Sequence, residues 1–347
     1  MNPTRLPLAL TMGEPAGVGG EITLKAWRAE KRSGNPFYVI DDPDRLAAVG
    51  EALGLGIPIA PIAGAEEAPD LFPQALPVLP LPLAHPVQPG WPDAANAGAV
   101  LASIRLAVEA AMAGKAAAVV TNPIHKKVLA DAGFRHPGHT EFLGELTGAT
   151  KPIMMLSCPG LRVVPVTVHT PLAMAIGMLT TGAIVAAARI TAEALHRDFA
   201  IAAPRLAIAG LNPHAGEQGM LGDEEREIIA PAVEQLRRDG LSVTGPAPAD
   251  SLFHARARAE YDAVICMYHD QALIPLKIID FDNGVDITLG LPVVRTSPDH
   301  GTALNIAGRG IARESSLLAA LHLARSMAEH RAEAYGGGVE RPDFARI

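Results

Sequence analysis

Apolar runs of strand length alternate with longer stretches of helical periodicity through most of this 347-residue chain. Such alternation is typical of a mainly parallel sheet with crossover helices. The pattern predicts strands over residues 6–12, 116–121, 152–157, 161–168, 204–209 and 262–267. It predicts helices over residues 21–31, 94–113, 172–198, 223–239 and 315–334. The expected fold class is therefore α/β.

Two segments depart from this alternation. Residues 58–92 contain ten prolines, and we expect an ordered but irregular excursion there with one edge strand. Between Arg162 and Arg189 the sequence has no Asp, Glu, Lys or Arg. A membrane helix needs about 20 continuous apolar residues, whereas Pro165 and Pro171 interrupt this segment. We interpret it as a buried strand followed by a buried helix, and we expect no membrane contact.

Length, charge and cysteine content narrow the classes of protein. The chain is longer than most single cores, which favours two α/β domains. A net charge of −8 gives no general attraction for nucleic acid, so no nucleic-acid partner is expected. The two cysteines, Cys158 and Cys266, lie near strand ends, and the N-terminus lacks the apolar core of a signal peptide. These features predict a cytoplasmic protein.

Three histidines follow directly on strand-like runs and lie in turns rich in Gly, Pro or Thr: His169, His214 and His269. Ligands of open α/β sheets bind at the carboxyl ends of the strands, so the three imidazoles could converge. Three protein ligands with an open fourth position are typical of catalytic zinc. The alternative for each histidine alone is a surface or locally hydrogen-bonded role. The first hypothesis is therefore a metal-dependent enzyme.

Two turns near predicted helix starts could bind anions. The Gly-rich turn from Thr11 to Glu21 matches neither G-x-G-x-x-G nor a P-loop, and we interpret it as a tight turn lining the interdomain cleft. Pro137-Gly-His-Thr-Glu-Phe places His139 and Thr140 at a helix entrance, where backbone N–H groups favour a phosphate or carboxylate. The alternative is that Thr140 is a simple N-cap.

The segment after His269 carries two cations and a second loop of interest. Lys277 and Arg295 lie beside apolar stretches, which suits an anion pocket, although either could be a paired structural cation. The loop His300-Gly-Thr-Ala-Leu-Asn-Ile-Ala-Gly-Arg-Gly resembles one in the isocitrate and isopropylmalate dehydrogenase superfamily. That loop binds the adenine part of NAD without the usual Rossmann fingerprint. The resemblance assigns His300, Gly301, Thr302 and Asn305 to the cofactor, although Asn305 stands where the superfamily often has Asp.

The motifs together resemble one family. They are Gly-Glu-Pro-Ala-Gly-Val-Gly, Pro-Gly-His-Thr-Glu-Phe, Val-Thr-Val-His-Thr, Leu-Asn-Pro-His-Ala-Gly-Glu, Met-Tyr-His-Asp-Gln and Thr-Leu-Gly-Leu-Pro-Val-Val-Arg-Thr-Ser-Pro-Asp-His-Gly-Thr-Ala. In this order, from about residue 8 to 325, they are similar to the 4-hydroxythreonine-4-phosphate dehydrogenase family, within the isocitrate/isopropylmalate dehydrogenase-like superfamily.

The resemblance implies a set of site residues and a fold. The divalent metal would be bound by His169, His214 and His269, contributed by both subunits of a homodimer. The substrate would be bound by His139, Thr140, Lys277, Asp286 and Arg295. Asp250 matches an acidic position near the metal and, with Lys277, is a candidate catalytic residue. The implied fold has two α/β domains flanking a cleft: residues 1–135 together with 298–347, and residues 136–297.

The implied activity is NAD- or NADP-dependent oxidation of 4-phosphohydroxy-L-threonine at C3 and decarboxylation to 3-amino-2-oxopropyl phosphate, in pyridoxal 5'-phosphate (vitamin B6) biosynthesis. Zinc is the expected metal, with cobalt or magnesium as alternatives. A metal that binds the C3 hydroxyl lowers its pKa and favours hydride release to NAD. Lys277 could move protons or only bind an anion.

One departure keeps the substrate open. Asp286 stands where the family has Asn, and a carboxylate about 4 Å from a phosphate would repel it by roughly 4 kcal/mol at an effective dielectric of 20. The alternatives are a dehydrogenase of 4-phospho-D-threonate or 4-phospho-D-erythronate, or of a cyclic cis-diol dicarboxylate. A non-catalytic metal-binding protein is a further alternative, but metal storage needs neither the two cations nor the His300–Gly310 loop.

Overall fold

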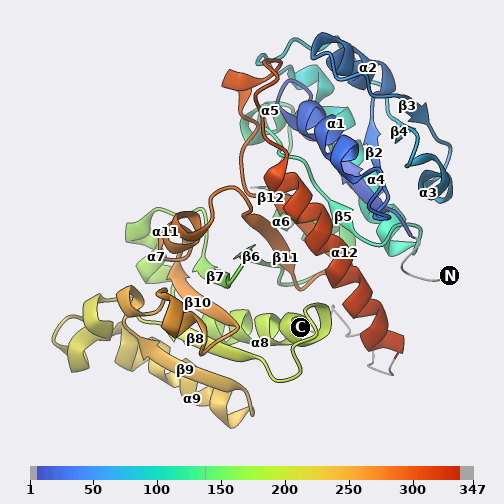
Figure 1. Cartoon of the computed structure of the whole chain (residues 1–347). Coiled ribbons are helices and arrows are strands. Elements are labelled where there is room, and N and C mark those ends of the chain that lie inside the picture. Colours follow the sequence, from blue (N-terminus) through green and yellow to red (C-terminus); the bar gives the residue numbers. More distant parts are fainter. Residues whose placement is uncertain (1–5, 137, 337–347) are drawn as a thin grey trace. The chain divides into compact units, whose positions relative to one another are not determined.

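The computed structural model describes residues 6–136 and 138–336. The chain forms two compact units, which we call unit 1 (Met1–Pro152 with Leu291–Ile347) and unit 2 (Ile153–Gly290) (Figure 1). The divisions fall at 152/153 and 290/291, whereas the sequence placed them at 135/136 and 297/298. The difference arises because α6 (His139–Thr147) packs Phe142 into the unit 1 core and β12 (Arg295–Pro298) pairs with a unit 1 strand.

Unit 1 contains a parallel sheet in the order β3-β4-β2-β1-β5-β12. Its strands not yet given are β1 (Leu8–Thr11), β2 (Phe37–Asp41), β3 (Ile59–Pro61), β4 (Leu76–Pro80) and β5 (Val119–Val120). Every residue of β1 and β2 is buried, as expected of parallel strands covered on both faces. The α/β class predicted from the alternation is confirmed.

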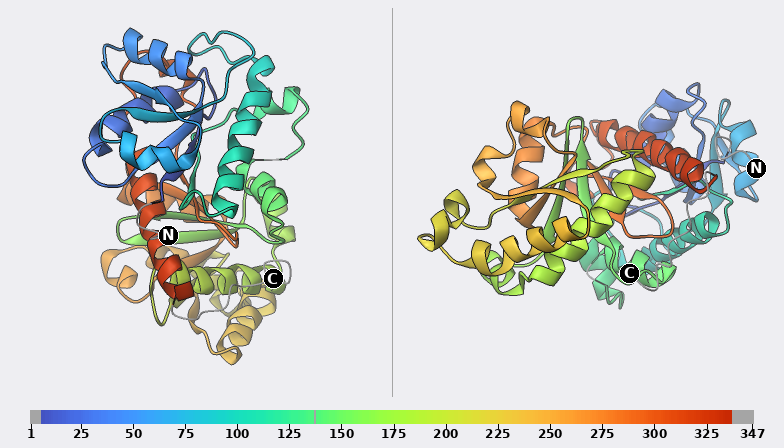
Figure 2. Two further views of the ribbon diagram at one scale, coloured as in Figure 1. Left: turned by 90° about the vertical axis from the view of Figure 1, so that its right-hand side faces the viewer. Right: turned by 90° about the horizontal axis from the view of Figure 1, so that it is seen from below.

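The helices of unit 1 are α1 (Gly19–Glu30), α2 (Pro43–Ala52), α3 (Ala68–Leu71), α4 (Ala97–Met112), α5 (Lys126–Asp131), α6 and α12 (Ser315–Gly336). Helix α4 packs Ile104 and Val108 into the same core as Ala9 and Ile40 of the central strands. Helices α1 and α12 lie side by side (Figures 1 and 2). The packed helices fix the strands of the unit 1 sheet, and with them the residues at the strand ends.

The proline-rich segment 58–92 forms more regular structure than its sequence predicted. It contains two strands instead of one, and β4 lies between β3 and β2. Pro77 is tolerated in β4 because the pairing with β2 begins one residue later, at Val78 opposite Val39, and the strand ends at Pro80. The prolines therefore remove few of the hydrogen bonds between β4 and its neighbouring strands.

Unit 2 contains a mixed sheet in the order β11-β6-β7-β10-β8-β9. Its strands are β6 (Ile153–Cys158), β7 (Leu161–Thr167), β8 (Arg205–Ala209), β9 (Ser242–Ala247), β10 (Ala263–Tyr268) and β11 (Val285–Leu289). Strand β6 is antiparallel to β11 and β7, and the other pairs are parallel. The helices are α7 (Leu172–Met178), α8 (Thr181–Asp198), α9 (Ala230–Arg238), α10 (Ala255–Arg258) and α11 (His269–Ile279).

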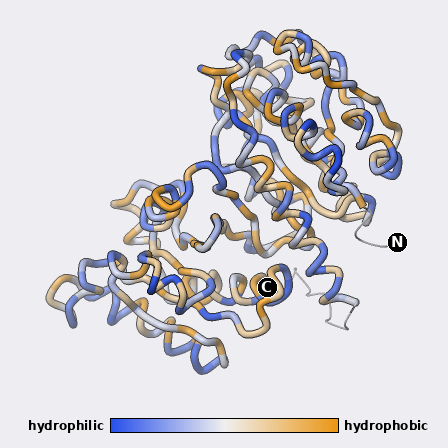
Figure 3. Tube along the Cα trace, viewed as in Figure 1, coloured by the Kyte–Doolittle hydropathy of each residue, from blue (hydrophilic) through white to orange (hydrophobic). Residues whose placement is uncertain are grey.

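The expected buried helix over 172–198 was wrong for its first part. Two helices, α7 and α8, meet at a bend of 90°, where Thr180 caps α8 through the Ala183 N–H group. Helix α8 buries most of one face, but in α7 Leu172 and Met178 remain 57% and 54% exposed. Apolar residues of α11 are exposed as well, since Ile274 is 57% and Ile278 79% exposed. Figure 3 shows how hydrophobic and hydrophilic residues alternate along the trace. Unit 2 therefore carries an apolar surface that unit 1 does not match.

By length and composition alone, one helix among the described residues could cross a membrane, Ala94–Met112, and the bent α7–α8 pair passes the same test. Most of the first segment is α4, whose Val100, Ile104 and Val108 are buried against the strands of unit 1. A core helix of an α/β unit has this composition, which explains its apolar character.

Candidate functional site

Unit 1 holds a buried guanidinium at the end of its sheet. Arg295, the first residue of β12, is 1% exposed. Its Nε and Nη2 donate to Oγ1 of Thr121 at 3.2 and 2.7 Å, and Thr121 directly follows β5. A buried charge is costly unless it is hydrogen-bonded, so Thr121 both stabilises and orients this cation.

His139 and Thr140 begin helix α6. Gly138 occupies the N-cap and no side chain caps this end, so the alternative that Thr140 is the N-cap is wrong. The first N–H groups of a helix have no acceptor within it and favour an anion. Pro137, the first residue of the motif, lies outside the described residues.

The imidazole of His139 is held neutral. Burial lowers its pKa well below the usual value, and the nearby cations Arg295 and Lys126 lower the pKa further. Its Nε2 atom is buried and makes no hydrogen bond within residues 6–136 and 138–336. A neutral, unsatisfied imidazole nitrogen beside a buried guanidinium and an uncapped helix start is suited to binding an anion. The sequence predicted His139, Thr140 and Arg295 for this role but missed Thr121 and Lys126.

Two of the three predicted metal ligands share a pocket in unit 2. His169 follows β7, and His269 is the first residue of α11. Their ring centroids are 6.0 Å apart, and both rings line a pocket of about 430 Å³ with Tyr268 and Asp270. The Nδ1 atom of His269 donates to Asp270 Oδ1 at 2.7 Å. A carboxylate on Nδ1 is the arrangement that leaves Nε2 for a metal.

The third imidazole lies elsewhere in unit 2. His214 follows β8 in the segment Pro213–Gly219, is exposed, and donates from Nδ1 to Glu217 at 2.7 Å. It does not line the pocket of His169 and His269. No group of three His, Cys, Asp or Glu residues close enough to hold a metal occurs among the described residues of the chain. Within one chain, therefore, two of the three predicted histidine ligands share a pocket and the third, His214, lies elsewhere.

Three further predicted residues are also in unit 2. Lys277 in α11 is half-buried, and its ammonium lies 5.0 Å from the centre of the Phe281 ring. Asp286 lies in β11 opposite Leu156 of β6. Asp250 is exposed in the short helix Ala249–Ser251, which contacts the segment carrying His214. Lys277 and Asp286 thus belong to unit 2, whereas the other predicted substrate residues belong to unit 1.

The predicted cofactor loop packs on the Gly-rich turn. The carbonyl of Thr302 accepts from the Val18 N–H group at 3.0 Å, and a Cβ on Gly17 would lie 2.8 Å from that carbonyl oxygen. His300 donates from Nδ1 to the Gly301 carbonyl, and Asn305 is in the short helix Leu304–Ile306. Gly17 is therefore needed for close approach, which gives the Gly-rich turn a structural role.

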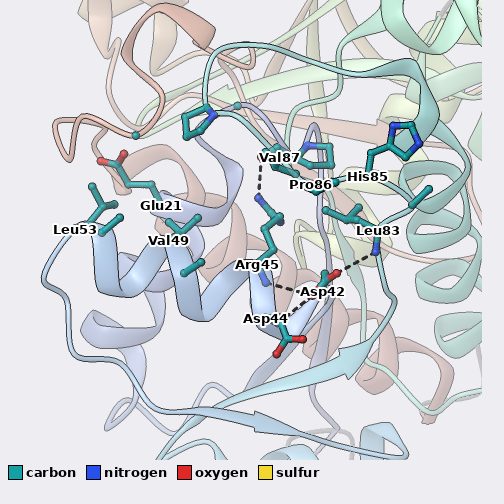
Figure 4. Close-up of a pocket in the computed structure, with 17 residues that line it drawn as sticks. Glu21, Asp42, Asp44, Arg45, Val49, Leu53, Leu83, His85, Pro86 and Val87 are labelled. Carbon is teal, nitrogen blue, oxygen red and sulfur yellow. Dashed lines mark hydrogen bonds between the residues drawn. The ribbon is translucent and has the colours of Figure 1, made fainter.

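A pocket of about 600 Å³ lies beside this loop (Figure 4). Its walls come from α2, from the segment Leu83–Pro89, from the Gly-rich turn and from Gly308. Glu21 accepts from Lys25 and from the Ala312 N–H group through Oε1, while its buried Oε2 has no hydrogen bond in the described part of the chain. The sequence did not predict this pocket, because its residues are scattered over distant segments.

Comparison with solved structures defines the class. The crystal structure of 4-hydroxythreonine-4-phosphate dehydrogenase from Klebsiella pneumoniae matches with a TM-score of 0.84 and 38% identity, covering 93% of this chain and 99% of that one. A terephthalate 1,2-cis-dihydrodiol dehydrogenase from Burkholderia xenovorans matches with a TM-score of 0.63 and 29% identity, covering 92% and 98%. The chain is thus an α/β oxidoreductase of the dehydrogenase class.

The family follows from sequence. The family model for the pyridoxal phosphate biosynthetic protein PdxA matches residues 33–324. A 4-hydroxythreonine-4-phosphate dehydrogenase of Caulobacter vibrioides is 54% identical over 334 residues, covering 94% of this chain and 99% of that protein. The chain belongs to the PdxA family of 4-hydroxythreonine-4-phosphate dehydrogenases in vitamin B6 biosynthesis, and the resemblance seen in the motifs is confirmed.

Proposed function

We propose that this chain oxidises 4-phosphohydroxy-L-threonine at C3 with NAD or NADP and a divalent metal, and that decarboxylation then yields 3-amino-2-oxopropyl phosphate. The observation that carries the proposal is the pair His169 and His269 in one pocket, with Asp270 on Nδ1 of His269. Family membership supports the same chemistry. We place the activity in the cytoplasm, because both cysteines are free and buried.

The residues present fit a metal site. His169, His214 and His269 would hold the ion, and neutral imidazoles suit zinc, or cobalt in its place, better than magnesium. His214 has a carboxylate on Nδ1, as His269 does, so both rings are oriented with Nε2 available. When bound, the metal lowers the pKa of the substrate hydroxyl. Asp250 lies in a short helix that contacts the segment of His214 and would be an acidic neighbour of the metal site.

We propose that the third imidazole comes from a second copy of the chain. His214 is exposed and lies apart from the other two rings, which is what a ligand donated to a partner subunit requires. Large apolar side chains are exposed on the same unit at Leu172, Met174, Ile176, Met178, Met220, Leu221, Ile274, Ile278 and Phe281. An exposed apolar surface of this kind is typical of an obligate interface, so we expect a homodimer.

The substrate would be held by anion-binding groups. His139, Thr140 and Arg295 form a positively polarised cluster in unit 1, and Lys277 supplies a cation in unit 2. Lys277 would bind the substrate through its ammonium, and moving a proton to or from the substrate is the alternative role. Asp286 would disfavour a phosphate close to its carboxylate. The likeness to a cis-dihydrodiol dehydrogenase makes a cyclic cis-diol the second candidate substrate.

NAD or NADP would be bound at the loop His300–Gly310, through His300, Gly301, Thr302 and Asn305. The adjacent pocket suits a nucleoside, because its walls are largely apolar and the buried Glu21 Oε2 can accept from a hydroxyl group. The nicotinamide accepts the hydride. Metal storage would need neither this loop nor Arg295, so an enzyme is favoured over a metal-binding protein.

The test follows NADH formation with 4-phosphohydroxy-L-threonine, 4-phospho-D-threonate, 4-phospho-D-erythronate and a cyclic cis-diol dicarboxylate, each with and without a chelator. We expect chelator-sensitive turnover that is fastest with the amino acid phosphate. Turnover restricted to any other substrate would reassign the enzyme within its class. No turnover with any of them would contradict the proposed function.

A further inference from the structure

An exposed lysine lies over the open end of α6. Lys126 begins α5, and a Cβ placed on Gly138 would lie 3.3 Å from Lys126 Cε and 3.4 Å from Lys126 Nζ. The ammonium therefore lies at the N-cap position of α6, which no side chain caps. Among the residues that the structure describes, Lys126 makes no ion pair within 4.0 Å. The carboxylate of Glu141 is close to the same place, with its Oε2 3.7 Å from that Cβ position.

The neighbouring lysine behaves differently. Lys127 pairs with Asp131 one helical turn away at 2.8 Å, in the manner of a solvated helix pair. Two adjacent lysines thus have different surroundings. Lys127 is neutralised locally, whereas Lys126 adds a positive charge to a region that already contains Arg295 and an uncapped helix start.

Two cations lie close enough to His139 to affect its imidazole. Lys126 and Arg295 both act on the imidazole, and the buried His139 Nε2 lacks a hydrogen-bond partner in residues 6–136 and 138–336. A phosphate has oxygens enough to accept from an ammonium, an imidazole and backbone N–H groups at once. A carboxylate has only two oxygens, with about four lone-pair sites, and fits a set of donors that approach from several directions less well.

We propose that Lys126 is a further substrate-binding residue, whose ammonium contacts the phosphate that His139, Thr140 and Arg295 also bind. The inference deepens the proposed function and rests on it for the identity of the substrate. The anion site itself stands on unit 1 alone, so it can be tested with inorganic phosphate in the absence of turnover.

The experiment compares Lys126→Ala with Lys127→Ala in the full chain. Phosphate binding is measured by calorimetry, and KM and kcat are measured with 4-phosphohydroxy-L-threonine. Loss of one charge-assisted hydrogen bond should weaken phosphate binding and raise KM by about 10-fold or more in Lys126→Ala, with kcat little changed. Lys127→Ala should behave as the wild type, and Lys126→Arg should restore most of the affinity.

Each other outcome decides a separate point. Equal phosphate affinity in Lys126→Ala and wild type would overturn the inference, and so would an equal loss in Lys127→Ala. An equal loss of acetate and phosphate binding would show that the site takes any anion, which would overturn the assignment to phosphate. If Lys126→Ala loses phosphate binding but the wild type turns over no phosphorylated substrate, the proposed function fails while the anion site remains.

Discussion

The candidate site residues are arranged differently in the two units. In unit 1, Arg295 is buried and held by Thr121, and the start of α6 lies with its donors ready for an anion. In unit 2, two imidazoles share a pocket while the third is exposed elsewhere. One chain therefore already brings the candidate anion-binding groups of unit 1 together. The proposed metal site would need a second chain and the ion itself.

The largest effect is expected at the histidines. His169→Ala and His214→Ala should each lower metal affinity and turnover by more than about 100-fold, because loss of an outer partner alone costs up to that much. Mixed in equal amounts and allowed to exchange subunits, the two inactive variants should recover about a quarter of the activity in a twofold dimer. Recovery requires His214 to come from the partner of the chain that supplies His169.

A control variant and a contrary outcome delimit this result. His196→Ala, at an exposed position of α8, should leave metal content and turnover unchanged. If the mixed variants stay inactive although their subunits exchange, His169 and His214 come from the same chain and the proposed contrast between the units disappears.

The preorganisation of unit 1 is tested at Thr121. Thr121→Val removes the acceptor of two hydrogen bonds from the Arg295 guanidinium, and a hydrogen bond to a charged group is worth about 1.5–3 kcal/mol. We expect KM for the phosphorylated substrate to rise by about 10-fold or more, with a smaller effect on kcat. Thr121→Ser keeps the oxygen and should restore KM. A KM unchanged in the valine variant would show that Arg295 is positioned by other contacts.

The neutral state of His139 predicts a dependence of stability on pH. Its pKa is lowered in the folded chain by burial and by two cations, so below about pH 6.5 the unfolded chain binds the proton and the folded chain does not. Its contribution to stability is therefore complete above that pH. Below it, up to about 1.4 kcal/mol is lost per pH unit, until the folded pKa is reached. Urea denaturation at pH 7.5 and 5.5 should show a smaller loss in His139→Gln than in wild type, and equal losses would contradict this assignment.

The smallest effect is expected at Asp286. Asp286→Asn removes a negative charge from β11, and a charge near a phosphate is unfavourable. We expect a modest decrease in KM for 4-phosphohydroxy-L-threonine and no gain with a substrate that lacks a phosphate. A rise in KM for the phosphorylated substrate would show that the carboxylate holds a substrate group or a cation instead.

The sequence predicted the fold class and about half of the strands, because continuous apolar runs of strand length are a local signal, but it did not predict β2, β9, β11 and β12. It also found the histidines, since each follows a strand. It missed the separation of His214, which depends on a run of left-handed backbone from His214 to Gln218; non-glycine residues rarely adopt that conformation and no propensity predicts it. Lys126 was missed for another reason. In the sequence it is half of a surface Lys-Lys pair, and only the packing of α6 distinguishes it from Lys127.

The arrangement of unit 2 as an insertion has a consequence for the growing polypeptide. Residues 153–290 are complete while unit 1 still lacks β12 and α12. Domains fold as units during synthesis, so unit 2 can close before unit 1, although unit 1 begins first. Thr121 then leaves the ribosome long before Arg295 exists, and the buried hydrogen bonds of the anion site are among the last native contacts that the nascent chain can make.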